Sequence, residues 1–289
     1  MKYAWIREHR EEFPVALMCE VLAVSRSGYY DWAVRKPGPM AIKRQKIAEA
    51  ARKYFHRSHG IYGYRKVHGD IVQEEKLECC WETVRRVMRE AGLYSRVRRK
   101  FVRTTDSRHT LPVAENVLGR DFAVDGPNRK WAADITYIGT LEGWLYLATV
   151  EDLYSRRIVG WSMSAEITAE LVRGALAMAV TQRCPGEGLV HHSDRGVQYA
   201  SDLFQDELRA RGIECSMSRR GNCWDNAPQE SFFGKLKSEW ICGRVYETRE
   251  QARKELFWYI EVFYNRIRRH AALGYVSPAQ FERDQEHAA

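Results

Sequence analysis

Three acidic residues in the second half of the chain have the types and positions that metal-assisted chemistry requires. Asp134 lies within the stretch WAADITY, Asp194 follows the short apolar run GLV, and Glu230 lies near the start of a helix-like segment. The sequence places 59 residues between the first two acids and 35 between the last two. A single aspartate is usually a cap, a turn residue or a surface charge. The order and spacing of all three, beside a basic region, favour a shared site.

Three carboxylates brought together would repel one another strongly unless cations neutralised them. Hard oxygen ligands select Mg²⁺ or Mn²⁺ rather than zinc. Two such ions, about 3.5–4 Å apart, can activate an attacking oxygen and stabilise the leaving oxygen of a phosphodiester. The three acids therefore predict a site that holds two divalent ions. A zinc site built from His56, His59, Cys79 and Cys80 is disfavoured, because adjacent cysteines seldom both bind one tetrahedral ion.

The segments around these acids alternate between strand-like and helix-like patterns. Three strands with short turns at Gly143 and Ser155 come first, and helices and strands then alternate. The expected strands are 131–140, 144–152, 156–164, 188–194 and 213–218, and the expected helices are 167–183, 201–212 and 225–240. The pattern predicts a mixed five-stranded α/β sheet with flanking helices. If the first and fourth strands are neighbours, Asp134 and Asp194 can face each other, and the last helix can bring Glu230 onto them.

Helix boundaries follow from residue types at the segment ends. Asp225 is a candidate cap for the helix that carries Glu230, and Pro228 would lie in its first turn. One face of the helix 167–183 is apolar and is formed by Leu171, Val172, Ala175, Leu176 and Ala179. After the sheet region we expect a long helix around residues 252–268 and an irregular tail.

The chain before the sheet region is helical in pattern and basic. Two short segments, with a break near Val24 and Ser25 as a cap, have the outline of a helix-turn-helix. The segment WETVRRVMREAGL places apolar and arginine side chains on different faces, and Gly92 is a plausible stop. From Val84 to Arg103 there are seven arginines and one lysine against a single glutamate. This stretch predicts a helix in a DNA groove and a basic arm on phosphates, rather than an ordinary solvated face.

The composition of the whole chain agrees with a nucleic-acid partner. Its 289 residues carry a formal net charge of +8, and 45% of them are hydrophobic. An excess of positive charge favours polyanions, with nucleic acid ahead of an anionic membrane surface. The charged N-terminus and the lack of a long apolar run predict neither a secretory signal nor a spanning helix. Seven cysteines without a CxxC pair favour a reduced, cytoplasmic setting.

Several motifs resemble one known family along almost the whole chain. WAADITYI, HHSDRGVQYASDLF and GNCWDNAPQESFFGKLKSEW are similar to the three catalytic motifs of insertion-sequence transposases with an integrase-type core. The resemblance is greatest to the OrfB type of the insertion-sequence-3 family. The softer matches, before and after the core, are VSRSGYYDW, HGIYGYRKVHGDI and FYNRIRRHAALGYVSPAQFE.

The resemblance implies a ribonuclease-H-like core and Mg²⁺-dependent cleavage and transfer of DNA strands, with Mn²⁺ as a substitute. Carried over by motif, Asp134 would bridge two ions, and Asp194 and Glu230 would each help to hold one. A basic residue two turns after the glutamate would contact the DNA end, which is Lys237 here. Gly234, one turn after Glu230, cannot supply a charge, so a contact from that position is either absent or comes from elsewhere, with Lys235 as a candidate.

The family also implies partners and a cellular setting. Two DNA ends must be held together, so we expect an oligomer on double-stranded DNA, at least a dimer. Family members usually carry an upstream frame, of the OrfA type, with its own helix-turn-helix, and an OrfA-type protein or fusion is therefore a candidate partner. The expected setting is the bacterial cytoplasm, at the nucleoid.

Charge and motifs together predict how the chain divides into domains and which residues contact DNA. The domain plan is a helix-turn-helix-like region (1–38), a helical DNA-binding domain with a basic arm (39–103), a linker (104–128), a catalytic core (129–243) and a C-terminal helical extension (244–289). The expected DNA contacts are Arg65, Lys66, Arg85, Arg86, Arg89, Arg96, Arg98, Arg99, Lys100, Lys235 and Lys237.

Other residues keep two interpretations at this stage. His192 and Arg195 could touch phosphate or shape the turn around Asp194. Trp224 could stack on a base or belong to the core, and Asn226 could contact DNA or form part of the helix cap. A further group could touch DNA or tie the C-terminal helix to the core: Asn265, Arg266, Arg269 and His270. Asp152 is expected in the turn before the third strand rather than as a ligand.

Two other functions remain open on the sequence. One is a ribonuclease-H-like nuclease that cuts DNA without joining it. The other is a DNA-binding regulator that keeps the core as a scaffold, against which the three intact acids argue.

Overall fold

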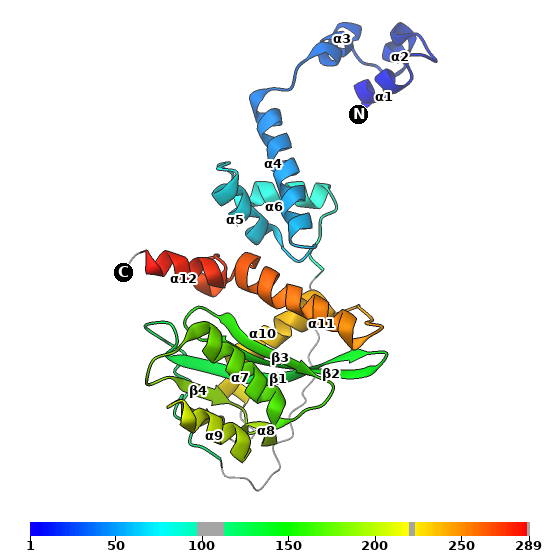
Figure 1. Ribbon diagram of the computed structural model, residues 1–289. Helices are drawn as coiled ribbons and strands as arrows, with labels where there is room; N and C mark the ends of the chain where they lie inside the picture. Colours follow the sequence, from blue (N-terminus) through cyan, green and yellow to red (C-terminus); the bar gives the residue numbers. More distant parts are fainter. Residues whose placement is uncertain (97–112, 220–222, 288–289) are drawn as a thin grey trace.

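A mixed five-stranded sheet forms the centre of the part of the molecule that contains the expected catalytic core, here called the catalytic half. The computed structural model describes residues 1–96, 113–219 and 223–287. The strands are β1 (Lys130–Thr140), β2 (Gly143–Asp152), β3 (Arg157–Ser164), β4 (Val190–Ser193) and β5 (Glu214–Met217), in the spatial order β3-β2-β1-β4-β5. The expected mixed sheet is therefore confirmed (Figure 1).

The pairing of the strands explains their composition. The first three strands form an antiparallel meander, and β4 and β5 then add in parallel on the other side of β1. At the first hairpin Gly143 adopts a φ of +102°, which a residue with a side chain rarely adopts. The neighbourhood of β1 and β4, on which the expected site depends, is confirmed.

Helices cover both faces of the sheet, and each face has its own apolar core. On one face α7 (Ala169–Arg183) packs with α8 (Val197–Ala200) and α9 (Asp202–Ala210). The buried positions of α7 are those that its periodicity predicts. The other face is covered by α10 (Ala227–Lys235) and the two π-helical segments η2 (Leu236–Ile241) and η3 (Trp258–Ile267) (Figure 1).

The N-terminal part is helical throughout its ordered elements. Its helices are α1 (Lys2–Glu8), α2 (Val15–Val21), α3 (Arg26–Val34), α4 (Pro39–Arg57), α5 (Tyr64–Glu74) and α6 (Trp81–Glu90). Ser25 caps α3 by accepting a hydrogen bond from the Gly28 N–H. Gly92 follows α6 with a φ of +66°, which confirms it as the helix stop.

The helices α4 to α6 share an apolar core with the catalytic half. Ile47, Val67 and Val84 from these helices belong to the same buried cluster as Phe232 and Phe263. In Figure 1 the α4–α6 group stands above the sheet, with the C-terminal helices between them, and α1 to α3 lie further out. The helices α4–α6 and the sheet are therefore joined by packing as well as by the chain.

The C-terminal tail is a correction to the sequence analysis, because it is helical. The long helix consists of α11 (Arg249–Phe257) and η3, and after the short turn η4 (Ala271–Leu273) comes α12 (Pro278–Glu286). Ser277 caps α12 by accepting from the Gln280 N–H, and Pro278 occupies its first turn. These are ordinary signals for a helix start, so the expectation of an irregular tail was wrong.

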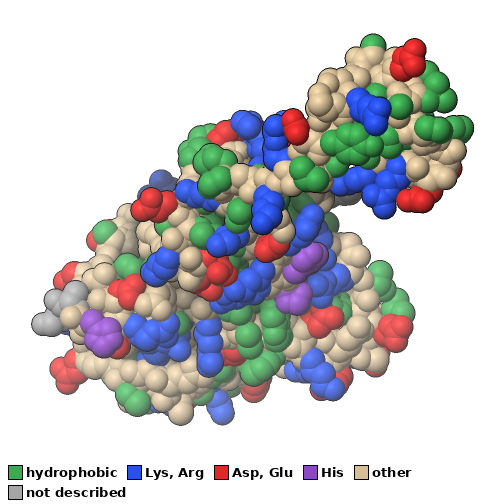
Figure 2. All heavy atoms as spheres, turned by 90° about the horizontal axis from the view of Figure 1, so that it is seen from above, with side chains coloured by type: hydrophobic (Ala, Val, Ile, Leu, Met, Phe, Trp, Pro, Cys, Tyr) green, Lys and Arg blue, Asp and Glu red, His purple; other side chains and the backbone are tan. Residues whose placement is uncertain are grey.

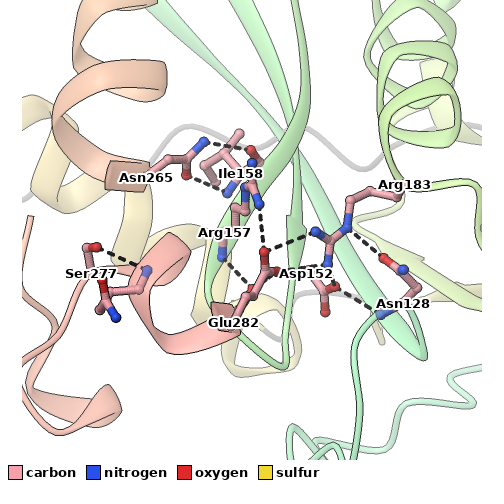
Figure 3. Close-up of polar contacts among 10 residues, drawn as sticks. Asn128, Asp152, Arg157, Ile158, Arg183, Asn265, Ser277 and Glu282 are labelled. Carbon is pink, nitrogen blue, oxygen red and sulfur yellow. Dashed lines mark hydrogen bonds and ion pairs between the residues drawn. The ribbon is translucent and has the colours of Figure 1, made fainter. Parts of the chain in front are cut away.

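A polar network fastens α12 to the sheet. Glu282 accepts hydrogen bonds from Ser155, Arg157 and Arg183 (Figure 3). Arg183 also reaches Asp152 at 3.1 Å. The end of β2, the end of α7 and the C-terminal helix are thereby held at one point.

The described part of the expected linker lies against the sheet. Leu118 is buried with Ala132 and Leu153. The Met217 N–H donates to the carbonyl of Glu115, so this segment runs beside the edge strand β5. None of the helices within 1–96, 113–219 and 223–287 is both long and apolar enough to cross a bilayer.

Candidate active site

Parallel pairing brings the two aspartates to adjacent positions. Ala132 of β1 pairs with His192 of β4, and two residues further along come Asp134 and Asp194. Asp134 is still inside the antiparallel pair with β2, opposite Thr149, whereas Asp194 follows the end of β4. The Asp194 carboxylate accepts the N–H of Gly196 at 2.9 Å, which sharpens the bend after the strand. The sheet thus delivers both acids to one edge.

Glu230 arrives from α10, whose start is fixed on β1. Asn226 donates to the carbonyl of Ala133, and Gln229 donates to the carbonyl of Ala132. Gln229 also accepts from the Thr149 hydroxyl. All three of these side chains are buried. Because these bonds lie beside Asp134, the first turn of α10 has a fixed position over that aspartate.

Asp225 does not cap this helix, which corrects the sequence analysis. The N-cap position belongs to Asn226, whose side chain makes no cap hydrogen bond. The fully buried Asp225 carboxylate instead pairs with Arg120 and Arg219, both at 2.8 Å. Arg219 holds the pKa of Asp225 well below its usual range through these hydrogen bonds. The expectation about Pro228 in the first turn is confirmed.

The electrostatics of the three acids suit a cation. Burial raises the pKa of Asp134 well above its ordinary value, and the charges of Asp194 and Glu230 raise it further. Within the described residues, no three His, Cys, Asp or Glu side chains are already arranged as a metal cage. The three carboxylates therefore share one region without closing around a point, and Glu230 remains exposed. An all-oxygen donor set with mutual repulsion fits a hard divalent ion.

Two lysines on the α10–η2 segment lie in different surroundings. The Lys237 ammonium lies 5.0 Å from the centre of the Tyr137 ring, and burial lowers its pKa while Asp134 raises it. Lys235 donates to Ser231, and burial lowers its pKa while nearby Glu151 raises it. Lys237 is therefore the lysine of this pair that faces the acids.

The residues that flank Asp194 are held by the sheet. Buried His192 bonds to the hydroxyls of Ser216 and Ser218 at 2.9 and 3.1 Å. Burial lowers the pKa of His192 to about 4. Arg195 donates from Nε to the carbonyl of Ser218 at 2.6 Å. His192 thus serves the packing of β4 on β5, whereas Arg195 remains partly exposed.

The expected DNA contacts in the helical domain divide into exposed and packed side chains. Four arginines are exposed on α5 and α6: Arg65, Arg85, Arg86 and Arg89. Arg85 pairs with Glu82 on the same helix, and exposed Arg96 donates to the carbonyl of His59. Lys66 is partly buried, 5.0 Å from the Tyr62 ring centre. Arg98, Arg99 and Lys100 lie outside the described residues.

The face of the molecule on the side of the helical domain, seen from above in Figure 2, carries many basic side chains. Figure 2 shows Lys and Arg side chains gathered toward the middle of this face, with acidic side chains among them. The exposed arginines of α5 and α6 belong to the helices at this end of the molecule (Figure 1). Such a mixture suits a surface that meets the DNA backbone through a subset of its cations.

The residues with two interpretations near the C-terminus are mainly structural. Asn265 bonds to both the N–H and the carbonyl of Ile158 (Figure 3). Arg269 pairs with Asp70 of α5, and His270 is buried. Arg266 is exposed. The contacts of Asn265 and Arg269 therefore fasten the C-terminal helix to the rest of the molecule.

Two further sequence expectations concern single side chains. Asp152 closes the turn before β3 by accepting the Tyr154 N–H, as expected. The side chain of Trp224 lies outside the described residues.

Sequence reasoning missed several residues that shape the site. Gln229, Arg120 and Arg219 were not singled out. A glutamine inside a helix and an arginine in a loop are usually solvated, so neither has a pattern that marks it. The proline at position 228 fixes the first turn, and it is the one signal that could have indicated a buried neighbour.

The comparisons with known proteins agree with this geometry. Family models for an integrase core domain match residues 124–223 and 211–278, and a model for an HTH-like domain matches residues 43–101. Transposase InsF for insertion sequence IS3A of Escherichia coli (strain K12) is 44% identical over 98% of both chains. The insertion element IS600 uncharacterized 31 kDa protein of Shigella sonnei is 42% identical over 91% of this chain and 97% of its own.

A solved structure completes the comparison. The simian T-cell lymphotropic virus intasome, in complex with the PP2A regulatory subunit B56 gamma, is 14% identical to this chain with a TM-score of 0.44. The match covers 80% of this chain and 74% of the intasome chain. With 44% identity across almost its entire length, and with the integrase-core and HTH-like models both matched, the chain belongs to the insertion-sequence-3 family of transposases.

Proposed function

We propose that this protein is a DNA transposase that cuts one strand at each end of an insertion sequence and joins the exposed 3′-hydroxyl to another phosphodiester. The observation that carries this proposal is the meeting of Asp134, Asp194 and Glu230 at one sheet edge, where two of the carboxylates raise the pKa of the third. Mutual repulsion of this kind is relieved by divalent cations.

The three carboxylates would hold two Mg²⁺ ions, with Mn²⁺ as a substitute. When bound, the ions would activate the attacking oxygen and neutralise charge on the leaving oxygen. The protein supplies the positions of its own groups. Gln229 and Asn226 fix the first turn of α10 on β1, and Lys237 places a cation beside Asp134 for a DNA phosphate. This positioning accounts for a large part of the catalysis in phosphoryl transfer.

DNA would lie across both halves of the molecule. The exposed arginines of α5 and α6 would contact double-stranded DNA, and the basic arm would extend that contact. Two element ends must meet for joining, so the working form would be at least a dimer on DNA. An OrfA-type protein or fusion would contribute to end recognition. The protein would work in the bacterial cytoplasm, on chromosomal DNA.

Strand cleavage and joining by purified protein test this function directly. Duplexes that carry the sequences flanking the gene are incubated with Mg²⁺ or Mn²⁺, with and without the OrfA-type protein, and nicked and joined strands are resolved on denaturing gels. Wild type is compared with Glu230→Gln and with Glu187→Gln, a matched control because Glu187 is exposed in a loop outside the site. We expect joined products from wild type and the control, and a loss of at least about 100-fold in Glu230→Gln.

The other outcomes separate the alternative functions. Nicks without joined strands, even with the OrfA-type protein, would favour the nuclease. Binding without cleavage would favour the regulator. Equal activity in wild type and Glu230→Gln would remove Glu230 from the site.

A further inference from the structure

A completely buried carboxylate, that of Asp225, lies in the short 3₁₀ helix η1 (Cys223–Asn226), just before the helix that carries Glu230. The Asp225 side chain has 0% exposure. It accepts hydrogen bonds from the Asn116 side chain, from the Arg120 Nε and from three donors of Arg219, all between 2.8 and 3.0 Å. Asp225 therefore ties the segment beside β5, which contains Asn116 and Arg120, to the residues that begin α10.

The two arginines on Asp225 are exposed although their shared partner is not. The Arg120 side chain is 43% exposed and the Arg219 side chain is 53% exposed. Arg120 Nε and Arg219 Nη2 both donate to the same oxygen, Oδ1. A guanidinium has five N–H donors, of which Asp225 takes one from Arg120 and two from Arg219. The carboxylate thus sets the orientation of two neighbouring cations whose remaining surface meets solvent.

A third arginine continues this arrangement toward the carboxylates. Arg195 comes directly after Asp194 in the chain, and its Nε donates to the carbonyl of Ser218, the residue before Arg219. The three guanidiniums are therefore fixed in order along the end of the sheet, from Asp194 past β5 to the segment that contains Arg120. Each is held by a protein acceptor rather than by a flexible surface contact.

The charges of this group do not balance. Two cations, Arg120 and Arg219, meet the single carboxylate of Asp225, so this pair of arginines has one positive charge in excess. One arginine would be enough to neutralise a buried carboxylate, and holding a second cation on the same oxygen costs free energy through like-charge repulsion. A polyanion that approaches the exposed sides would relieve this repulsion. The fork of a guanidinium matches the oxygens of a phosphodiester in geometry as well as in charge.

We propose that Arg195, Arg219 and Arg120 form a track for the phosphates of a DNA strand that leads away from the catalytic carboxylates, with Asp225 as its positioning residue. The proposal rests on the function proposed above and adds a DNA contact outside α4–α6 and outside the α10–η2 lysines. The strand belongs either to the element end or to the target duplex, because both present the same phosphodiester chemistry.

The salt dependence of DNA binding tests the track. Full-length wild type, Arg120→Gln and Arg219→Gln are titrated with an element-end duplex and with an unrelated duplex at several salt concentrations, without divalent metal. We expect each substitution to weaken binding and to reduce the slope of log affinity against log salt by about 1, the effect of losing one phosphate contact. Arg209→Gln is the matched control, because Arg209 is 70% exposed on α9, where it pairs with Asp206 of the same helix.

Two further variants separate contact from folding. Arg120→Lys and Arg219→Lys keep the charge, so they should retain most of the slope while losing the bidentate geometry. Asp225→Asn keeps every arginine but releases the orientation of Arg120 and Arg219. We expect it to keep the slope and to lower the rate of strand joining, with thermal unfolding measured on every variant to identify loss of fold.

Each outcome decides for or against the track. A reduced slope with one duplex alone supports it and identifies that duplex as the occupant. Slopes equal to that of wild type in both glutamine variants, with both duplexes, would overturn it even if wild type cuts and joins DNA normally. If wild type neither cuts nor joins, the proposed function fails, and the slopes still report independently on the arginines.

Discussion

The buried side chain of a single residue outside the active site, Glu151, makes the stability of this protein depend on pH. Glu151 lies in β2, almost without exposed surface, with Arg156 3.7 Å away. Its Oε2 atom has no hydrogen-bond partner among the described residues. Burial raises the pKa of Glu151 to about 7, against an opposing effect of Arg156 and Lys235. The folded protein therefore retains this proton to a higher pH than the unfolded chain.

Replacing this acid should stabilise the protein at neutral pH and above. The stability that a proton on Glu151 confers is complete below its ordinary pKa of 4.5 and is lost as the pH rises through 7. Relative to wild type, Glu151→Gln should therefore gain about 2 to 3 kcal/mol of unfolding free energy between pH 4.5 and 8. Urea unfolding across this range measures the gain, with Glu187→Gln as the control. A difference that stays constant with pH would contradict the argument.

Single residues show where sequence reasoning stops. Asp134 and Asp194 could be placed together only on the condition that the first and fourth strands are neighbours, and the pairing of β1 with β4 fulfils that condition. Asp225 could not be assigned correctly, because its partner Arg120 is 105 residues away in the chain. The local sequence pattern, an aspartate before a proline-containing turn, predicts a helix cap. The pairing of that aspartate with a distant arginine becomes visible only in the fold.

Close approach of two elements makes one glycine of β3 irreplaceable. A Cβ atom added at Gly160 would lie 2.2 Å from the carbonyl oxygen of Ala175 and 2.7 Å from the Cβ of Ala179, both on α7. No flexible side chain can move aside here, since the nearest atom belongs to the backbone. The contact between β3 and α7 depends on that missing side chain.

Gly160→Ala should force α7 away from the sheet. We expect a loss of about 1 to 3 kcal/mol of unfolding free energy, as is usual for an overpacked core. Thermal and urea unfolding measure the loss. Gly186→Ala is the control, because a Cβ at Gly186 meets nothing within 4 Å. Equal stability of the two variants would mean that α7 and β3 are not packed as described.

The elements differ in how far their sequences predict them. The apolar face of α7 could be predicted residue by residue, because it repeats with the helical period and all its positions are buried. The helix α12 was missed although Ser277 and Pro278 mark its start. Its buried face consists of Pro278, Ala279 and Glu282, and the burial of this acid depends on arginines about a hundred residues earlier in the chain. Polar helix faces of this kind have no apolar period to find.

One buried ion pair at the scale of the whole molecule joins the helical domain to the C-terminal extension. Arg269 pairs with Asp70 of α5 and also donates to Gln73 and to the carbonyl of Tyr275. The Tyr62 hydroxyl lies between the two parts, donating to the carbonyl of Ile267. Together with the shared apolar core, these contacts make α4–α6 and the catalytic half one mechanical unit.

Breaking this pair should uncouple the two parts. Arg269→Gln leaves the Asp70 carboxylate buried without its cation, which costs about 3 to 5 kcal/mol. In differential scanning calorimetry we expect the single transition of a coupled molecule to divide, with the helical domain unfolding first. The control is Arg283→Gln, since Arg283 is exposed on α12 and donates to Gln280 of the same helix. One unchanged transition would contradict the role of the pair.

The joint between α5 and the C-terminal extension also has a geometric consequence for DNA. If a duplex is bound by α4–α6 while the phosphodiester to be cut lies at Asp134, the fold fixes the distance between the bound segment and the cleaved bond. The number of base pairs between them is then a property of the fold rather than of the DNA. Lengthening an element end by one base pair would rotate the bond to be cut around the helix axis and out of reach. The number of nucleotides at the end of the element would then matter as well as their sequence.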